Sequence, residues 1–173
     1  MSHLAASETG NPPPTIIVIF GASGDLTARK LAPAIFNLSQ DRLLPENCFL
    51  IGVGRSPMED KEFRSYLKES LEQYSRRIID EENWNKLEPN IYFHGGAYDD
   101  LQSFKILENM ILGLEKELQQ PAQCLFYIST PPSVFEPVLE NLGESGLAKR
   151  HHGTEFASKV VIEKPFGKDL ESA

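Results

Sequence analysis

The residues best suited to chemistry form a glycine turn directly after an apolar run. Residues 15–20 are mostly apolar and β-branched, and the turn that follows them consists of Gly21, Ala22, Ser23, Gly24, Asp25, Leu26 and Thr27. A strand that ends in such a turn and opens a helix presents backbone N–H groups and the positive helix end to a pyrophosphate. The glycines fall as G-x-x-G rather than G-x-G-x-x-G, so the surrounding elements have to support a nucleotide site.

Arg55 and Ser56 indicate which nucleotide the turn would serve. They follow the second apolar run, at the place where sheets that bind NAD normally carry an acid for the ribose hydroxyls. A guanidinium forks onto a phosphate and serine adds a hydroxyl donor, so the pair favours the 2′-phosphate of NADP. The alternative is a surface arginine beside a serine that only caps a helix. Asp41 has the spacing of the NAD acid, but it precedes the second strand and therefore belongs to the wrong end of the sheet.

Short apolar runs alternate with amphipathic segments along the chain. The strands predicted from these runs are residues 15–20, 48–53, 91–94, 125–128 and 160–162. This β-α alternation predicts an α/β fold, a Rossmann-like doubly wound parallel sheet with helices on both faces. Ligands of such sheets bind beyond the carboxyl ends of the strands, which here carry the glycine turn, Arg55-Ser56, Gly95-Gly96, residues 129–132 and Lys164-Pro165.

The helix after the glycine turn carries a pattern typical of one buried face. Asp25 is its predicted cap, and the apolar stripe at i, i+3, i+4, i+7 consists of Leu31, Ala34, Ile35 and Leu38. Pro33 interrupts this pattern, because an interior proline removes a hydrogen bond. Either the helix kinks at Pro33 or the main helix begins just before it.

The remaining helices are marked by caps and by apolar periodicity. Ser56-Pro57-Met58-Glu59 predicts a capping box with proline at the first helical position. The apolar residues behind it predict a helix through residues 63–74, and similar patterns predict helices over residues 80–87, 104–118 and 133–142.

Composition narrows the class of protein. The chain has 173 residues and 40% hydrophobic content, which fits one domain over residues 15–173 behind a disordered lead-in at residues 1–14. Its net charge of -8 argues against nucleic acid or an anionic membrane as the main partner. Cys48 and Cys124 lie in apolar runs without metal-ligand spacing, so we expect buried free thiols, no metal site and a cytoplasmic location.

Three motifs together resemble the amino-terminal coenzyme domain of the glucose-6-phosphate dehydrogenase family. The glycine turn with residues 29–34 resembles the coenzyme loop of that family, and Gly54-Arg55-Ser56 resembles its adenosine-phosphate site. Residues 163–170 resemble a third family motif, and the similarity runs in one order over about residues 15–173. The resemblance implies oxidation of glucose 6-phosphate at C1 to 6-phosphogluconolactone in the pentose phosphate pathway, with hydride passing to NADP.

The resemblance also implies roles for individual residues. Residues 21–27 would hold the pyrophosphate region and Arg55 the adenosine phosphate. Lys30 would contact the nucleotide, unless it is a solvated helix lysine. Phe135 stands at a family position near the coenzyme that can be tyrosine, although a plain core aromatic is the alternative. Lys164 would bind both substrate and coenzyme, held in extended backbone by Pro165, for which a cis bond is an alternative.

The catalytic base expected from the resemblance is missing from the sequence. In that family a histidine beyond the coenzyme domain takes the hydroxyl proton as hydride leaves, and no such motif occurs here. His3 lies in the lead-in, His94 ends a strand, and His151-His152 are expected to be solvated in a polar loop. We therefore expect a truncated chain that binds NADP but is inactive alone, lacking the carboxy-terminal β+α domain through which the full-length protein forms a homo-oligomer.

Two other functions fit parts of the sequence. A non-catalytic NADP-binding sensor or regulatory module would use the same fold and glycine turn without a base. That alternative leaves the motif at residues 163–170 without a role. A short-chain reductase would need a Tyr-x-x-x-Lys pair at helical spacing, and the chain has none.

Overall fold

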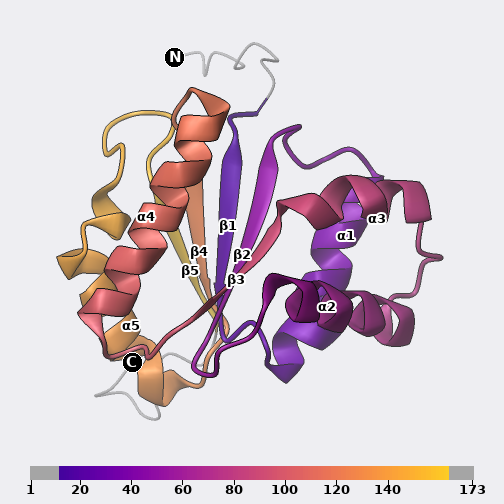
Figure 1. Cartoon of the computed structure of the whole chain (residues 1–173), viewed down its shortest axis with the longest axis horizontal. Coiled ribbons are helices and arrows are strands. Elements are labelled where there is room, and N and C mark those ends of the chain that lie inside the picture. Colours follow the sequence, from indigo (N-terminus) through magenta and orange to yellow (C-terminus); the bar gives the residue numbers. More distant parts are fainter. Residues whose placement is uncertain (1–11, 164–173) are drawn as a thin grey trace, which may run out of the picture.

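A five-stranded parallel sheet forms the middle layer of the computed structural model, which describes residues 12–163 (Figure 1). The strands are β1 (Thr15–Phe20), β2 (Cys48–Gly54), β3 (Ile91–Gly95), β4 (Gln123–Ile128) and β5 (Lys159–Ile162). Their order across the sheet is β3-β2-β1-β4-β5. The predicted parallel, doubly wound fold is confirmed, and each predicted strand is present with its bounds shifted by at most two residues. Of the predicted lead-in, residues 1–11 lie outside the described residues.

Helices cover both faces of the sheet. One face is covered by α1 (Ala32–Gln40), α2 (Asp60–Tyr74) and α3 (Glu81–Leu87), and the other by α4 (Leu101–Leu118) and α5 (Phe135–Glu144) (Figure 1). Because successive side chains of a strand point to opposite faces, β1 contributes side chains to both of the helix-covered faces. Ile16, Val18 and Phe20 pack toward α4 and α5, whereas Ile17 and Ile19 pack toward α1 and α2. None of these helices is both long enough and apolar enough to cross a membrane.

The two cysteines lie within these layers as the sequence predicts. Cys48 begins β2 and Cys124 lies in β4, and both are buried free thiols. Burial raises the pKa of Cys48 to about 11 and that of Cys124 to about 12. Both thiols are therefore protonated at neutral pH and serve as packing residues.

The predicted apolar stripe of the first helix is right for Leu31 and Ile35, which pack partly buried against the core, and wrong for its other two residues. Ala34 is exposed and Leu38 is 40% exposed, and the fully buried face carries Ala28, Ala32 and Phe36 instead. The cause is a π-helical stretch, Thr27–Leu31, that precedes α1 and widens the turn, so later residues are rotated about the helix axis. The regular α-helix begins at Ala32, just before Pro33, which is the second of the two predicted arrangements.

The start of α2 also differs from the prediction. The N-cap is Glu59, and its backbone N–H donates to the carboxylate of Glu62 at 2.9 Å, so the capping box lies three residues beyond Ser56. Pro57 passes close over the end of β3, since a Cβ on Gly95 would lie 2.7 Å from Pro57 Cα. The chain therefore crosses the sheet edge before it turns into the helix.

Candidate functional site

A cavity of about 450 Å³ lies beyond the carboxyl ends of the strands. Four connections line it: the glycine turn after β1, Arg55 and Ser56 after β2, Tyr98 after β3, and residues 129–134 after β4. β1 lies at the centre of the sheet, where the crossover direction reverses between β2 and β4. Parallel sheets bind ligands at this switch point, because the loops on its two sides diverge there. The structure thus brings the glycine turn and Arg55 to one cavity, as the sequence predicts.

Gly21 opens the glycine turn in a conformation reserved for glycine. Its φ is +82°, and a Cβ at this position would lie 2.9 Å from the carbonyl oxygen of Ser129. Its N–H lies 3.0 Å from both the carbonyl oxygen of Val53 and the hydroxyl oxygen of Tyr98. The turn is therefore fastened to the ends of the neighbouring strands and to the loop after β3.

The glycine turn leaves several amide groups without a protein acceptor. The N–H of Gly24 donates to Gly21 at 2.9 Å, and that of Ala28 donates to Gly24 at 3.1 Å. Within residues 12–163, the amides of Ser23, Asp25 and Leu26 make no such bond. These groups form the first turn of the helical segment that runs into α1, where backbone N–H groups and the helix dipole favour an anion.

Arg55 supplies a positive charge to the cavity. It follows the last residue of β2, is exposed, and lines the cavity with Ser56. Within residues 12–163, no carboxylate forms an ion pair with its guanidinium. Asp41, which has the spacing of an NAD ligand, pairs instead with Arg77 at 2.8 Å, beyond the opposite end of the sheet. The cavity therefore presents a cation where NAD-binding sheets present an acid.

Tyr98 also lines the cavity, although the sequence analysis did not assign it to the site. It is 7% exposed, packs edge-on against Phe20 with ring centroids 6.2 Å apart, and has its carbonyl oxygen bound by the Asn141 side chain at 2.9 Å. Burial raises the pKa of its phenol, and the Gly21 N–H and the Arg55 charge offset part of that rise. The phenol is therefore protonated at neutral pH. Its position three residues beyond β3 was the one available signal.

The other predicted residues of the turn occupy different surroundings. Ala22 and Thr27 are fully buried, and Leu26 is half-buried. Asp25 is exposed and pairs with Arg29 at 2.7 Å.

The structure places the more distant candidates outside the cavity lining. Lys30 is exposed on the π-helical stretch, and Phe135 is half-buried against the core beneath α5. Lys164 lies outside the described residues. Its neighbour Glu163 accepts a hydrogen bond from the phenol of Tyr127 on β4, and burial together with Glu163 raises the pKa of Tyr127 to about 12. This contact ties the residue before Lys164 to the carboxyl end of β4.

Comparison with known proteins places this domain in a family. The model of the glucose-6-phosphate dehydrogenase NAD binding domain matches residues 18–173. The chain belongs to the glucose-6-phosphate dehydrogenase family. It is 36% identical to glucose-6-phosphate 1-dehydrogenase of Chlamydia muridarum, over 93% of this chain and 32% of that protein. The Treponema pallidum enzyme is 34% identical over 96% of this chain and 32% of its own length. The chain thus spans about a third of these relatives.

Solved structures of glucose-6-phosphate dehydrogenases have the same fold. One, described as a complex with its substrate glucose-6-phosphate, superposes with a TM-score of 0.79 at 32% identity, covering 95% of this chain and 33% of that chain. The enzyme of Mycobacterium avium gives a TM-score of 0.76 at 27% identity, covering 92% and 32%. The resemblance drawn from the sequence motifs is confirmed, and membership of this family favours a dehydrogenase domain over a separate sensor module.

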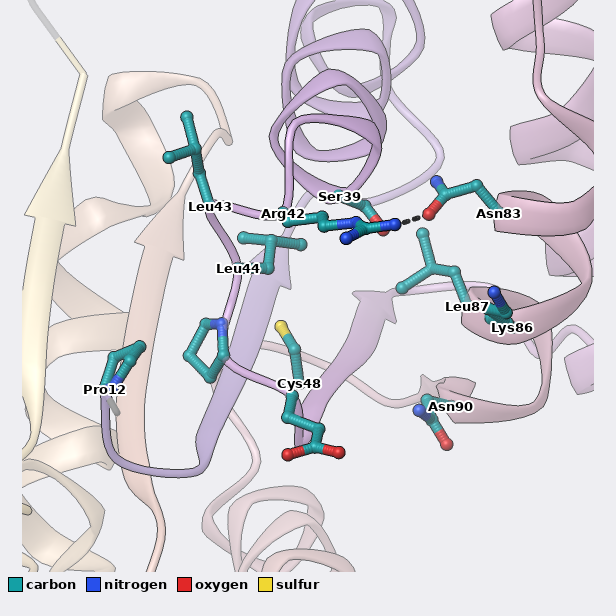
Figure 2. Close-up of a pocket in the computed structure, with 12 residues that line it drawn as sticks. Pro12, Ser39, Arg42, Leu43, Leu44, Cys48, Asn83, Lys86, Leu87 and Asn90 are labelled. Atoms are coloured by element: carbon teal, nitrogen blue, oxygen red, sulfur yellow. Dashed lines mark hydrogen bonds between the residues drawn. The ribbon is translucent and has the colours of Figure 1, made fainter. Parts of the chain in front are cut away.

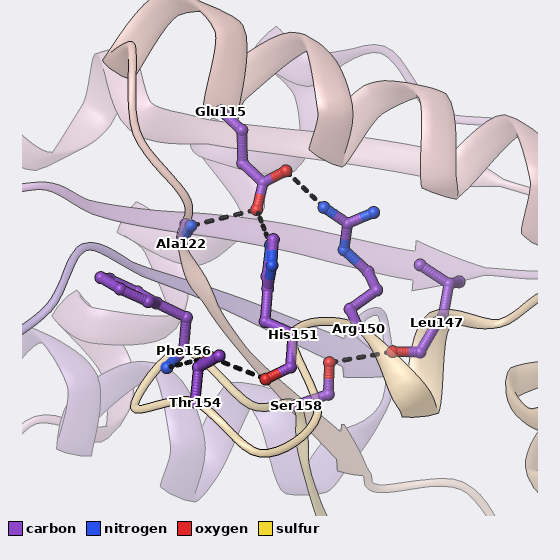
Figure 3. Close-up of polar contacts among 8 residues, drawn as sticks. All are labelled: Glu115, Ala122, Leu147, Arg150, His151, Thr154, Phe156 and Ser158. Atoms are coloured by element: carbon purple, nitrogen blue, oxygen red, sulfur yellow. Dashed lines mark hydrogen bonds and ion pairs between the residues drawn. The ribbon is translucent and has the colours of Figure 1, made fainter.

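Two histidines of this glucose-6-phosphate dehydrogenase domain, His94 and His151, have side-chain partners. His94 is 7% exposed and its Nε2 lies 2.8 Å from Ser103 Oγ, and burial lowers its pKa, so the ring is neutral at pH 7. The prediction that His151 is solvated is wrong. Its Nε2 contacts Glu115 at 2.8 Å, and Glu115 also binds Arg150 and the N–H of Ala122 (Figure 3). These contacts join α4 to the loop before β5 near the amino ends of the strands.

A second cavity, of about 420 Å³, lies near the amino ends of β1 and β2 (Figure 2). Arg42 and Lys86 bring positive charge to its rim, and Cys48 and Leu87 form apolar parts of its wall. The carboxyl end of α1 points toward this cavity, so the helix dipole there opposes an anion. No glycine turn borders it. Volume alone therefore does not distinguish the two cavities, but backbone polarity does.

Proposed function

We propose that this chain is the coenzyme-binding portion of an NADP-dependent glucose-6-phosphate dehydrogenase. The observation that carries the proposal is the meeting of Arg55 and Ser56 with the glycine turn in one cavity at the switch point of the sheet. A guanidinium and a hydroxyl group can donate hydrogen bonds to a phosphate dianion, whereas the ribose hydroxyl groups of NAD donate to an acidic side chain. The cavity therefore suits the nucleotide that carries the additional 2′-phosphate.

The backbone around the cavity suits such a coenzyme, as does the charge of Arg55. The unpaired amides of Ser23, Asp25 and Leu26 would bind the pyrophosphate, and the absence of a side chain at Gly21 lets the backbone approach it. Ala22 and Thr27 are buried and would act by shaping the turn. Lys30 and Phe135 would contact the nucleotide at the margins of the cavity, as their counterparts in the family resemblance imply.

The proposed reaction is the oxidation of glucose 6-phosphate at C1. The coenzyme supplies the hydride acceptor, and Lys164 would bind the sugar phosphate beside it, with Tyr127 fixing the preceding residue. Among residues 12–163, no histidine lines the cavity, so this part of the chain places no histidine there to take the hydroxyl proton. We therefore expect the chain alone to bind NADP without turnover. The pentose phosphate pathway, a cytoplasmic location and a homo-oligomeric full-length protein are further parts of this proposal.

Calorimetric titration of the chain with NADP⁺ and NAD⁺ tests the coenzyme assignment. We expect NADP⁺ to bind more tightly, and Arg55→Glu to weaken NADP⁺ by at least about 100-fold while leaving NAD⁺ nearly unchanged, since a charge-assisted pair is replaced by repulsion. Arg42→Glu is the matched control, because it reverses a charge at the cavity of similar volume near the amino ends. Equal loss in both variants would contradict the assignment.

Absorbance of NADPH tests the expected inactivity. The purified chain is mixed with glucose 6-phosphate and NADP⁺, and no steady rise is expected because no histidine among residues 12–163 lines the cavity. A sustained rise that scales with protein concentration would overturn this part of the proposal.

A further inference from the structure

Two hydroxyl groups beneath the glycine turn, those of Thr27 and Ser129, connect the turn to the loop after β4. Thr27 is fully buried, and its Oγ1 donates to the carbonyl oxygen of Gly21 at 3.2 Å and lies 3.3 Å from Ser129 Oγ. Ser129 Oγ in turn donates to the carbonyl oxygen of Phe20 at 2.7 Å. The two residues are 102 positions apart in the chain, so the contact joins the start of the helical segment to the loop after β4.

The three distances indicate how the two hydroxyl groups are used. Two hydroxyl protons serve three contacts, and the shortest of these, from Ser129 to Phe20, takes the serine proton. The threonine proton is then shared between the Gly21 carbonyl and the serine oxygen. Both protons are directed at the last residue of β1 and the first residue of the turn, which is where the backbone changes direction.

The pair contacts Gly21, which has a positive φ and is closely packed. Gly21 has a φ of +82°, and the space for a Cβ there is occupied by the Ser129 carbonyl oxygen at 2.9 Å and Ser129 Oγ at 3.2 Å. Ser129 thus packs against one side of Gly21 while Thr27 holds its carbonyl oxygen. With Gly21 fixed, Gly24 donates to the same carbonyl, and the amides of Ser23, Asp25 and Leu26 keep one orientation.

We propose that Thr27 and Ser129 are positioning residues that preorganise the glycine turn for the pyrophosphate of the coenzyme. This proposal rests on the proposed function. Neither hydroxyl needs to contact the ligand. Their effect is that the amides are already aligned before binding, so less conformational entropy is lost when the anion arrives. The Arg55 side of the cavity, on the loop after β2, makes none of these contacts and should be insensitive to them.

The experiment compares two probes that differ in the group recognised by the turn. NADP⁺ carries the pyrophosphate, whereas adenosine 2′-monophosphate carries only the phosphate that Arg55 would bind. Dissociation constants for both are measured by calorimetry on the whole chain and on Thr27→Val, which removes the hydroxyl at nearly constant volume. We expect the constant for NADP⁺ to rise about ten-fold, the equivalent of one lost hydrogen bond, and that for the monophosphate to change less than two-fold.

Two further variants keep the test decisive. Thr27→Ser restores the hydroxyl and should recover most of the NADP⁺ affinity, which a purely space-filling role of Thr27 would not allow. Ser129→Ala removes the partner and should weaken NADP⁺ similarly, and the double variant should lose less than the sum because the pair acts as a unit. If Thr27→Val does not fold, Ser129→Ala decides by the same two constants.

The outcomes separate this inference from the proposed function. Unchanged NADP⁺ affinity in folded Thr27→Val and Ser129→Ala, or a parallel loss for both probes, overturns the positioning role. Failure of the unmodified chain to bind either probe overturns the proposed function and this inference with it.

Discussion

The two ends of the sheet enclose cavities of nearly equal volume, about 450 Å³ at the carboxyl ends and about 420 Å³ at the amino ends, yet their polar groups differ in kind. Near the amino ends, Asp41 pairs with Arg77, and Glu115 pairs with Arg150 and His151. At the carboxyl ends, the amides of Ser23, Asp25 and Leu26 have no hydrogen-bond acceptor within residues 12–163, and Arg55 pairs with no carboxylate there. A polar group with protein partners contributes to stability, whereas one without them is available to a ligand. Changes at the two ends should therefore separate stability from binding.

The largest effect is expected at Gly21. Gly21→Ala combines a positive φ with a Cβ 2.9 Å from the Ser129 carbonyl oxygen, so the turn has to move. We expect NADP⁺ affinity to fall by at least about 100-fold in calorimetry. Gly146→Ala is the matched control, because its φ is +85° but its Cβ would meet no atom within 4 Å. It should cost about 1–2 kcal/mol of folding free energy and leave binding unchanged. Similar binding loss in both variants would show that strain alone is responsible.

Adding coenzyme should stabilise one end of the sheet only. At 100 times its dissociation constant NADP⁺ adds about 2.7 kcal/mol to the free energy of unfolding, a rise in melting temperature of roughly 5–10 °C for a chain of this size. Hydrogen exchange should show new local protection at Ser23, Asp25 and Leu26, whose amides lack partners within residues 12–163. Residues near Glu115 and Ala122 serve as the internal control. Protection confined to the amino ends would reverse the assignment of the two cavities.

Glu115→Gln should reduce the stability of the fold without changing the affinity for NADP⁺. Burial alone would raise the pKa of Glu115, but the hydrogen bonds from the Ala122 N–H, His151 and Arg150 outweigh it and the pKa is lowered from 4.5. The carboxylate therefore stabilises the fold above about pH 4.5, and this contribution is lost as pH falls through the lowered pKa. We expect a loss of about 2 kcal/mol at pH 7 in denaturant melts, shrinking below pH 4.5. A pH-independent difference, or weakened NADP⁺ binding, would contradict this role.

The sequence predicted the arrangement of residues at the carboxyl ends of the strands better than that at the amino ends. Apolar runs define the strands, and a parallel sheet places their ends together, so the meeting of Arg55 with the glycine turn could be predicted. Contacts between side chains distant in the chain left no periodic signal, which is why the Thr27–Ser129 pair and the partners of His151 were not foreseen. The buried face of α1 was missed because helical periodicity assumes 3.6 residues per turn, and the π-helical stretch before it breaks that rule.

The smallest effect is expected for His151→Gln, and it tests whether the amino-end cluster depends on one partner or several. His151 lies in the left-handed region with φ of +50° and contacts Glu115 at 2.8 Å, while its side chain remains 29% exposed. Glutamine retains a hydrogen-bond donor, and Arg150 and the Ala122 N–H continue to hold the carboxylate. We expect a loss of about 0.5 kcal/mol in denaturant melts at pH 7. A loss as large as that of Glu115→Gln would mean that the histidine, rather than the arginine, carries the connection between α4 and the loop before β5.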